Sequence, residues 1–299
     1  RHTRFRNVTG VQTCALPISL DNGVRIFTPG LADVLGQQII VDNRPGAGGM
    51  IAMQIGIASA PDGYTLINAG APQMIAPYLF KKLPYEFFRD FAPIGRLTSV
   101  QNVLIIHPAL PATNAKALID LLKAKPGQFN MASAGVGSAS HLAGILFNAM
   151  TGVQAVHVPY KGGAAAMVAL IGNEAQYLIT PLSATIGHIK AGRVKVLGTG
   201  GDTRTRQLPD VPTLDEAGVK GYRSTGWNGL FVKSGTPRVI VTRLTAALGV
   251  VYANPDLAER ILRGGVEPGL ITGDAFTAFM RDESARFGVA AKAAGLKPE

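Results

Sequence analysis

The sequence is poor in the residues that build disulfide frameworks and metal clusters. It contains one cysteine, Cys14, in 299 residues, so neither an intrachain disulfide nor a cysteine-based metal site can form. Charged residues make up only 16% of the chain, and no uninterrupted apolar run reaches the ~18 residues that a membrane-spanning helix needs. With 47% hydrophobic residues, the chain is long and apolar enough for two globular domains.

Acidic residues are scarce relative to basic ones. Lys and Arg number 29 against 19 Asp and Glu, which gives a net charge of +10. The basic residues are scattered, with no run longer than Lys81–Lys82, and neither RNA-binding aromatic motifs nor a helix-turn-helix pattern is present. We therefore expect no nucleic-acid partner, and a basic exterior that weakly attracts anionic solutes.

Residues 1–18, "RHTRFRNVTGVQTCALPI", differ from the rest of the chain because they show no hydrophobic periodicity. They contain no apolar segment of signal-peptide length, so we expect no signal peptide in them. Two interpretations stay open: foreign sequence fused to a truncated gene, or a disordered tail. Under either interpretation Cys14 says nothing about function.

Beyond this segment, short apolar strands alternate with helical patterns, which predicts an α/β fold with mostly parallel sheets. The first helical pattern, Asp21–Leu35, contains Thr28-Pro29-Gly30, where we expect a kink or an end. Residues 83–99 show no clear period and are expected to be irregular. In such folds, ligands bind at the carboxyl ends of the strands.

One stretch, Phe129–Pro159, has the clearest pattern of a binding site. A β-prone run ends in small residues, "ASAGVGS", and a helical pattern begins near Ser138 or Ser140. A helix N-terminus offers unpaired N–H groups and the positive end of its dipole. Glycine lets the backbone approach a ligand, and serine adds uncharged donors. The pattern therefore predicts a site for a small carboxylate.

Residues suited to catalysis or to cofactor binding are few. The glycines of Gly46–Gly49 lack the third glycine and the acidic residue of a dinucleotide fingerprint, so a tight strand-to-helix turn is favoured there. His141 follows Ser138 by three residues and could face it on a helix, but no acidic residue that would orient it can be assigned. His157 lies in an apolar strand and is expected to be a core residue. No spacing typical of metal ligands occurs, so we expect no metal and no cofactor.

The chain carries eight short motifs in order: "IIVDNRPGAGG" (39–49), "PDGYTL" (61–66), "DFAPIG" (90–95), "SAGVGSASHL" (133–142), "VPYKGG" (158–163), "HIKAGRVKVL" (188–197), "LPDVPTLDEAG" (208–218) and "GTP" (235–237). Together they resemble the tripartite tricarboxylate transporter substrate-binding proteins, the TctC or Bug family. The resemblance runs from about Asp21 to the C-terminus.

The resemblance implies a fold of the periplasmic-binding-protein type II kind, with two α/β lobes and a ligand cleft between them. Lobe 1 would comprise residues 19–101 and 223–299, and lobe 2 residues 102–222. It further implies a periplasmic, monomeric solute receptor, not an enzyme. Such a receptor captures a tricarboxylate, dicarboxylate or related organic acid and delivers it to a tripartite tricarboxylate-type membrane permease. The first strand of lobe 1 would be missing or replaced, because the two glycines that follow it in the family fall on Pro17 and Ile18.

The family's ligand-binding residues carry over to a serine- and glycine-rich loop, a tyrosine turn, a strand-end loop of lobe 1 and an aromatic residue near the lobe crossing. Thr180 stands where some members have Asp, which favours a plain carboxylate over a ligand with an ammonium group. The positions are Asp21, Gly70, Ala71, Ser133, Gly135, Gly137, Ser138, Ser140, Tyr160, Thr180 and Trp227.

Two other functions stay open from the residues alone. A hydrolase would use Ser138 as its nucleophile and His141 as its base. The ligand-sensing domain of a transcriptional regulator would need an attached DNA-binding module, and the sequence shows none.

Overall fold

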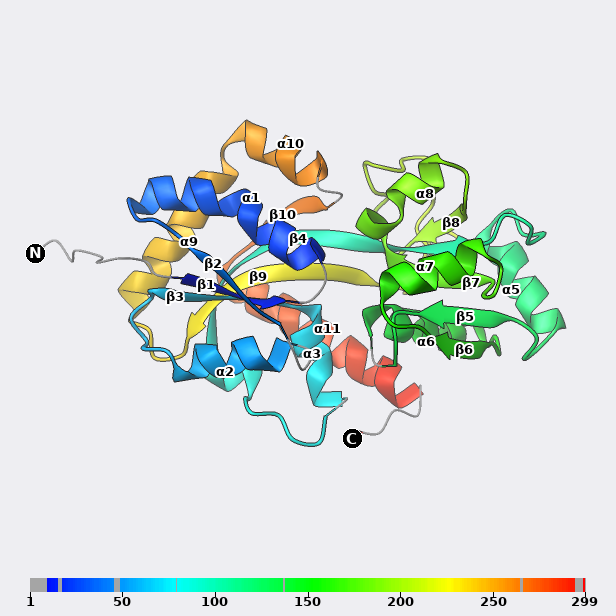
Figure 1. Ribbon diagram of the computed structural model, residues 1–299, viewed down its shortest axis with the longest axis horizontal. Coiled ribbons are helices and arrows are strands. Elements are labelled where there is room, and N and C mark those ends of the chain that lie inside the picture. The colour runs from blue at the N-terminus through cyan, green and yellow to red at the C-terminus, as the bar shows by residue number, and fades with distance from the viewer. Residues whose placement is uncertain are drawn as a thin grey trace, which may run out of the picture. The chain divides into compact units, whose positions relative to one another are not determined.

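A computed structural model describes residues 10–15, 18–45, 49–78, 80–136, 138–263, 266–293 and 298. The chain divides into two compact units (Figure 1). Unit 1 consists of Arg1–Ser99, Trp227–Ala285 and Pro298–Glu299, and unit 2 of Val100–Gly226 and Arg286–Lys297. The lobe boundaries expected from the sequence, after residues 101 and 222, stay a prediction.

Three elements carry the chain from one unit to the other: β4 Phe91–Ile106, β9 Thr225–Lys233 and α11 Gly273–Ala293. The first part of β4 includes residues 91–99, which were expected to be irregular. In unit 1 this part pairs antiparallel with β10 Glu267–Ile271.

Unit 1 is built on strands in the order β2-β1-β3-β9, in which β1, β2 and β3 are parallel and β9 is antiparallel to β3. Helices α1 and α2 cover opposite faces of this sheet (Figure 1). Besides β9 and β10, the elements of unit 1 are β1 Gly10–Ala15, α1 Ile18–Leu35, β2 Val41–Pro45, α2 Met50–Ala58, β3 Thr65–Gly70, α3 Ala71–Ile75, the 3-10 turn Ala76–Tyr78, α4 Phe87–Asp90, α9 Arg238–Tyr252 and α10 Pro255–Arg263.

Strand β1 lies where the first strand of lobe 1 was expected to be missing or replaced. It runs between β2 and β3, and Val11 is opposite both Val41 and Leu66. Without it, the facing edges of β2 and β3 would leave backbone N–H and C=O groups unpaired. Residues 10–15 therefore fill the position, so the strand is not missing. That it replaces the family's own strand, and that residues 1–18 are foreign sequence, stay predictions.

Helix α1 continues through Pro29, so the end expected at Thr28-Pro29-Gly30 is wrong, whereas a kink there stays a prediction. Proline removes one helical hydrogen bond and crowds the preceding turn. Burial on one face offsets this, because Val24, Phe27 and Leu31 are all almost fully buried. Gly36, with φ of +66°, ends the helix as a left-handed C-cap residue.

Unit 2 is a three-layer α/β unit whose strands run in the order β4-β7-β5-β6, with β8 also paired to β4. Alternate residues of β4 face two different cores. Leu104 and Ile106 pack with α5 and α6, whereas Val103 and Ile105 pack with α7. Besides β4, the elements are α5 Ala115–Ala124, β5 Asn130–Ser133, α6 Ala139–Thr151, β6 Val156–Pro159, α7 Gly163–Ile171, β7 Tyr177–Pro181, the 3-10 turn Leu182–Ala184, α8 Ile186–Lys190 and β8 Lys195–Thr199.

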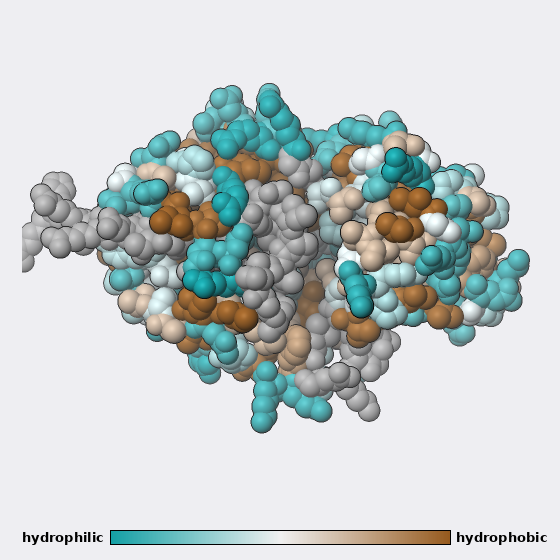
Figure 2. Space-filling view, viewed as in Figure 1, coloured by the Kyte–Doolittle hydropathy of each residue, from teal (hydrophilic) through white to brown (hydrophobic). Residues whose placement is uncertain are grey.

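The visible surface of each unit is largely hydrophilic and carries small, separate hydrophobic patches (Figure 2). Among the described helices, none is long and apolar enough to cross a membrane.

Candidate functional site

The serine loop, Ser133–Ser140, connects β5 to α6 in unit 2. Its last turn is fixed by Ser138, which has extended backbone angles and is the N-cap of α6. The Ser138 hydroxyl accepts a hydrogen bond from the backbone N–H of His141 at 3.2 Å. The helix thus begins where the sequence predicted it.

Two further serines tie the loop to itself. The Ser140 hydroxyl accepts a hydrogen bond from the Ala134 N–H at 2.9 Å, and the Ser133 hydroxyl accepts one from the Gly135 N–H at 3.1 Å. Both serines are almost fully buried. Gly135 has φ of +120°, a conformation that L side chains rarely adopt. Gly137, also expected at the site, lies outside the described residues.

The α6 N-terminus leaves donors for a ligand. The first helical bond runs from the Leu142 N–H to the Ser138 carbonyl, at 3.0 Å, and the His141 N–H is bonded to the Ser138 hydroxyl. By the geometry of a helix end, the N–H groups of Ala139 and Ser140 have no partner within the helix. They point outward from the positive end of a helix of 13 residues.

The parallel sheet brings other predicted residues to the same edge. Strand β5 pairs in parallel with β6 on one side and with β7 on the other, so their carboxyl ends coincide. Tyr160 follows β6, and its N–H donates to the Ser133 carbonyl at 3.0 Å. Thr180, which is buried, is the next-to-last residue of β7. Ser133, Tyr160 and Thr180 therefore lie at one edge of unit 2.

Tyr160 is a neutral donor at this edge. Burial, and then the Glu174 carboxylate, raise the pKa of its phenol above the usual value of about 10. The next residue, Lys161, is exposed and contributes a cation to the same turn.

His157 was expected to be a core residue, but it is only half-buried and it contacts the serine loop. Its Nε2 atom lies 2.6 Å from the Ser133 hydroxyl oxygen. Its ring stacks on that of His141, with 3.9 Å between centroids and 22° between planes. The sequence alone did not reveal this contact. It depends on two facts together: His157 is two residues before the end of β6, and β6 pairs with β5.

Both imidazoles favour the neutral form. Burial, and then the neighbouring His157, lower the pKa of His141 from 6.5 to about 4. Burial also lowers the pKa of His157. The serine loop is therefore built from uncharged groups at neutral pH.

The residues do not form a catalytic triad of the expected kind. The Ser138 hydroxyl is engaged as the helix cap, where it accepts the backbone N–H of His141. Ser133 and His157 are a closer hydroxyl–imidazole pair. However, β5, α6, β6 and α7 contain no Asp or Glu that could orient a catalytic histidine. Nor do the described residues contain any group of three or more side chains suited to hold a metal ion.

In unit 1, Gly70 and Ala71 lie where β3 meets α3, as expected for a strand-end loop. The Gly70 N–H donates to Gln73 Oε1 at 2.9 Å. A Cβ atom on Gly70 would lie 2.1 Å from the Trp227 carbonyl oxygen, so this position accepts only glycine without a backbone shift. The structure thus explains Gly70 by packing; a ligand contact there stays a prediction.

Trp227 and Asp21 are the remaining predicted contacts in unit 1. Trp227 is buried and meets Phe276 and Phe279 edge to face, at 5.6 and 5.5 Å between ring centroids. Its indole N–H has no hydrogen-bond partner in the part of the chain that the structure describes. Asp21 lies on α1, near Arg25, but its side chain is outside the described residues. A ligand contact at either residue stays a prediction.

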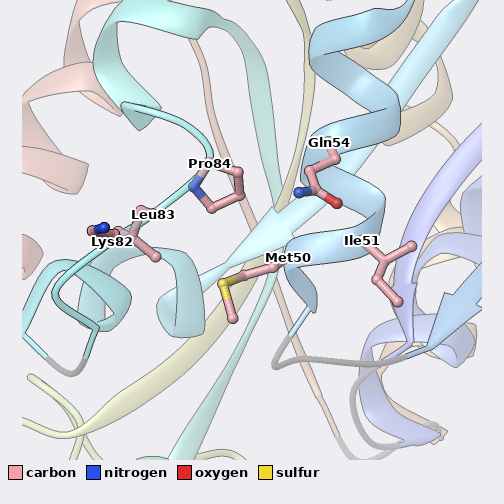
Figure 3. A pocket seen from close by; sticks show the side chains of 6 residues that line it. All are labelled: Met50, Ile51, Gln54, Lys82, Leu83 and Pro84. Carbon is pink, nitrogen blue, oxygen red and sulfur yellow. The ribbon is translucent and has the colours of Figure 1, made fainter. Parts of the chain in front are cut away.

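A groove of about 400 Å³ lies elsewhere, on unit 1, between α2 and the segment Lys82–Pro84 (Figure 3). Met50, Ile51 and Gln54 line it from the helix. The lining is mainly apolar, with one cation, and includes none of the predicted site residues. It is therefore distinct from the serine loop.

Comparison with known proteins places this geometry in a family. A model described as "Tripartite tricarboxylate transporter family receptor" matches residues 24–296. Rpa4515 of R. palustris, solved with adipate, is 29% identical, with a TM-score of 0.84 over 97% of this chain and 98% of that one. The periplasmic binding protein BugD is 30% identical, with a TM-score of 0.79 over 97% and 98% of the two chains.

A third solved structure is MatC (Rpa3494) from Rhodopseudomonas palustris with bound malate. It is 28% identical, with a TM-score of 0.77 over 95% of this chain and 98% of that one. The matched family consists of receptors and not of enzymes. The chain belongs to the tripartite tricarboxylate transporter family of solute-binding receptors, with the two-unit α/β fold that its motifs predicted.

Proposed function

We propose that this protein captures a small carboxylate in the periplasm and delivers it, as a monomer, to a membrane permease of the tripartite tricarboxylate type. The observation that carries the proposal is the serine loop. It presents backbone N–H groups at the start of α6, at the edge where three parallel strands end. An anion placed there would meet the positive end of the helix and would need no metal.

The binding chemistry follows from the donors. A carboxylate oxygen would accept hydrogen bonds from the N–H groups of Ala139 and Ser140, which the helix leaves unpaired. Apart from the two neutral histidines and the Tyr177 phenol, the strands and helices at this edge carry no ionisable side chain: β5, β6, β7, α6 and α7 contain no Lys or Arg. Binding by neutral, fixed donors suits a receptor that must also release its ligand, because no buried ion pair has to be broken.

Dicarboxylates of four to six carbons are the first ligands to test. Rpa4515 was solved with adipate and MatC with malate. In this chain Lys161, one residue after Tyr160, is an exposed cation beside the loop and is suited to a second carboxylate. Gly70, Ala71, Asp21 and Trp227 remain predicted ligand contacts, and the proposal does not depend on them.

Thermal unfolding and calorimetry with a panel of acids test the proposal. The panel is adipate, malate, citrate and benzoate, with dimethyl adipate as an uncharged control of similar shape. A bound acid at 100 times its Kd stabilises the folded protein by about 2.7 kcal/mol, which raises the Tm by roughly 5 °C. We expect at least one acid, and not the diester, to do so. If no acid at millimolar concentration shifts the Tm or releases heat, the proposed function is wrong.

A further inference from the structure

We propose that His157 is a positioning residue for the serine loop, which it holds by fixing the direction of the Ser133 hydroxyl. This role rests on the proposed function, because the serine loop is the part that would bind the carboxylate. The sequence had led us to expect that His157 is only a core residue.

The hydrogen-bonding capacity of Ser133 shows how the role works. A serine hydroxyl has one proton to donate and two lone pairs to accept. One lone pair accepts the Gly135 N–H at 3.1 Å. The proton can go to the Gly135 carbonyl at 3.2 Å or, in the tautomer that carries the ring proton on Nδ1, to His157 Nε2 at 2.6 Å. The shorter contact favours the histidine.

The direction of this proton matters for the peptide of Gly135. When Ser133 donates to His157, the imidazole fixes the direction of the Ser133 O–H bond. The lone pair that accepts the Gly135 N–H then also has a fixed direction. Gly135 sits at φ of +120°, where the backbone has little intrinsic preference to stay. An external hydrogen bond of this kind is what keeps such a turn in one conformation.

The stack on His141 fixes the imidazole in turn. The two rings are 3.9 Å apart between centroids, and His141 itself is almost fully buried on α6. The elements around the pair supply no counter-ion: β5 and α7 have no ionisable side chain, α6 has only His141, and β7 has only Tyr177. Burial lowers the pKa of both histidines, which favours the neutral form of His157. The ring proton is assigned to Nδ1, which leaves Nε2 as the acceptor of the Ser133 hydroxyl at 2.6 Å.

Two substitutions separate the hydrogen bond from the stack. His157→Phe keeps an aromatic ring against His141 but removes the acceptor. His157→Gln loses the ring but keeps a carbonyl oxygen that can reach the position of Nε2. His188→Phe, on α8 of the same unit, is the matched control for exchanging a half-buried histidine for phenylalanine.

The first measurement needs no ligand. Amide hydrogen exchange of the peptide covering 133–142 is followed in the full chain. We expect His157→Phe to speed this exchange at least tenfold, and His157→Gln and His188→Phe to stay within threefold of the unchanged protein. Equal exchange in His157→Phe and the unchanged protein, or equal acceleration by Phe and Gln, would overturn the positioning role.

The second measurement is the Kd for adipate, or for whichever panel acid binds best. We expect a tenfold weaker Kd in His157→Phe and a change of less than threefold in His157→Gln. If no acid binds the unchanged protein but the exchange results are as expected, the proposed function fails while the positioning role stands. If acids bind and His157→Phe binds as well as the unchanged protein, the positioning role fails alone.

A double-mutant cycle keeps the test decisive if His157→Phe is unstable. Ser133→Ala removes the hydroxyl that His157 is proposed to orient. If the two act through one hydrogen bond, the exchange rate of the double variant Ser133→Ala, His157→Phe matches that of the worse single variant. Additive effects would show that His157 acts by another route and would contradict the proposal.

Discussion

Two strand-to-helix turns in this protein depend on glycine for different reasons: a neighbouring atom at one turn and a backbone angle at the other. At Gly70, between β3 and α3 of unit 1, the backbone is extended, with φ of −164°, and any residue could adopt it. What excludes a side chain is the Trp227 carbonyl, 2.1 Å from the position of a Cβ atom. At Gly135, in the serine loop of unit 2, space is available, since the nearest contact of a Cβ atom is 3.4 Å away, but φ is +120°.

The difference separates a turn fixed by packing from a turn fixed by hydrogen bonds. Gly70 lies against the β9 backbone, with which β3 pairs through Asn228. The serine loop is held mainly by hydrogen bonds to the Ser133 and Ser140 hydroxyls. We infer that adding a side chain disturbs this loop less than the turn at Gly70, because no backbone atom of a neighbouring strand blocks the added atom.

The substitution Gly70→Ala should have the largest effect on stability. The added methyl group overlaps a backbone carbonyl, so β9 must shift, and overpacking of this kind costs about 3 kcal/mol. Trp227, the only tryptophan, lies in unit 1 beside the altered position, and its fluorescence during urea unfolding reports on this unit.

The matched control for Gly70→Ala is Gly249→Ala. Gly249 lies within α9 of the same unit, and a Cβ atom there meets nothing within 4 Å. Alanine in a helix should stabilise unit 1 by about 0.5–1 kcal/mol. A Gly70→Ala protein as stable as the unchanged one would show that steric exclusion does not explain this glycine.

The serine loop could be predicted from the sequence because its chemistry is local. The helix start, the cap and the glycine with positive φ all fall within Ser133–Ser140, and each follows from a residue type at a fixed distance along the chain. The contact of His157 with Ser133 joins positions 24 apart and depends on the register of β6 against β5. A periodic pattern contains no information on such a register.

Three elements of the fold were misread for a related reason. Residues 10–15 lack a strand pattern of their own, but the gap between β2 and β3 gives their backbone partners on both sides. The first part of β4 contains Pro93 and Gly95, which hide its strand character, although pairing with β10 maintains it. In α1 the burial of one face outweighs Pro29. In each case tertiary contacts overrode local propensity.

Gly135→Ala tests the other side of the comparison and should have a smaller effect. The strain of placing alanine at φ of +120° costs about 1–2 kcal/mol, because the loop can relax where β9 cannot. We expect the Kd for the best panel acid to weaken about tenfold, with no change in the urea transition seen by Trp227. The control is Gly187→Ala on α8, where a Cβ atom meets nothing within 4 Å and φ is not positive. Weaker stability in unit 1 would mean that the two turns are not independent.

The smallest effect is expected from removing one helix cap, and two caps of the same unit can be compared. Ser138→Ala and Asn114→Ala each remove a side chain that accepts an N–H at the start of a helix, at 3.2 Å for α6 and 2.8 Å for α5. Each should lower the stability of unit 2 by about 1 kcal/mol, measured as faster amide exchange in the helix concerned.

Only the Ser138 cap is part of the serine loop, where its hydroxyl also lies 3.1 Å from that of Ser140. We therefore expect Ser138→Ala to weaken binding of the best panel acid by about threefold to tenfold, and Asn114→Ala to leave the Kd unchanged. Equal Kd values for the two variants would mean that the cap of α6 serves stability alone. A weaker Kd in Ser138→Ala alone would show that the hydrogen bond that begins the helix also orders the donors for the ligand. The turn at Gly70 has no such double role, because packing against the Trp227 carbonyl explains it.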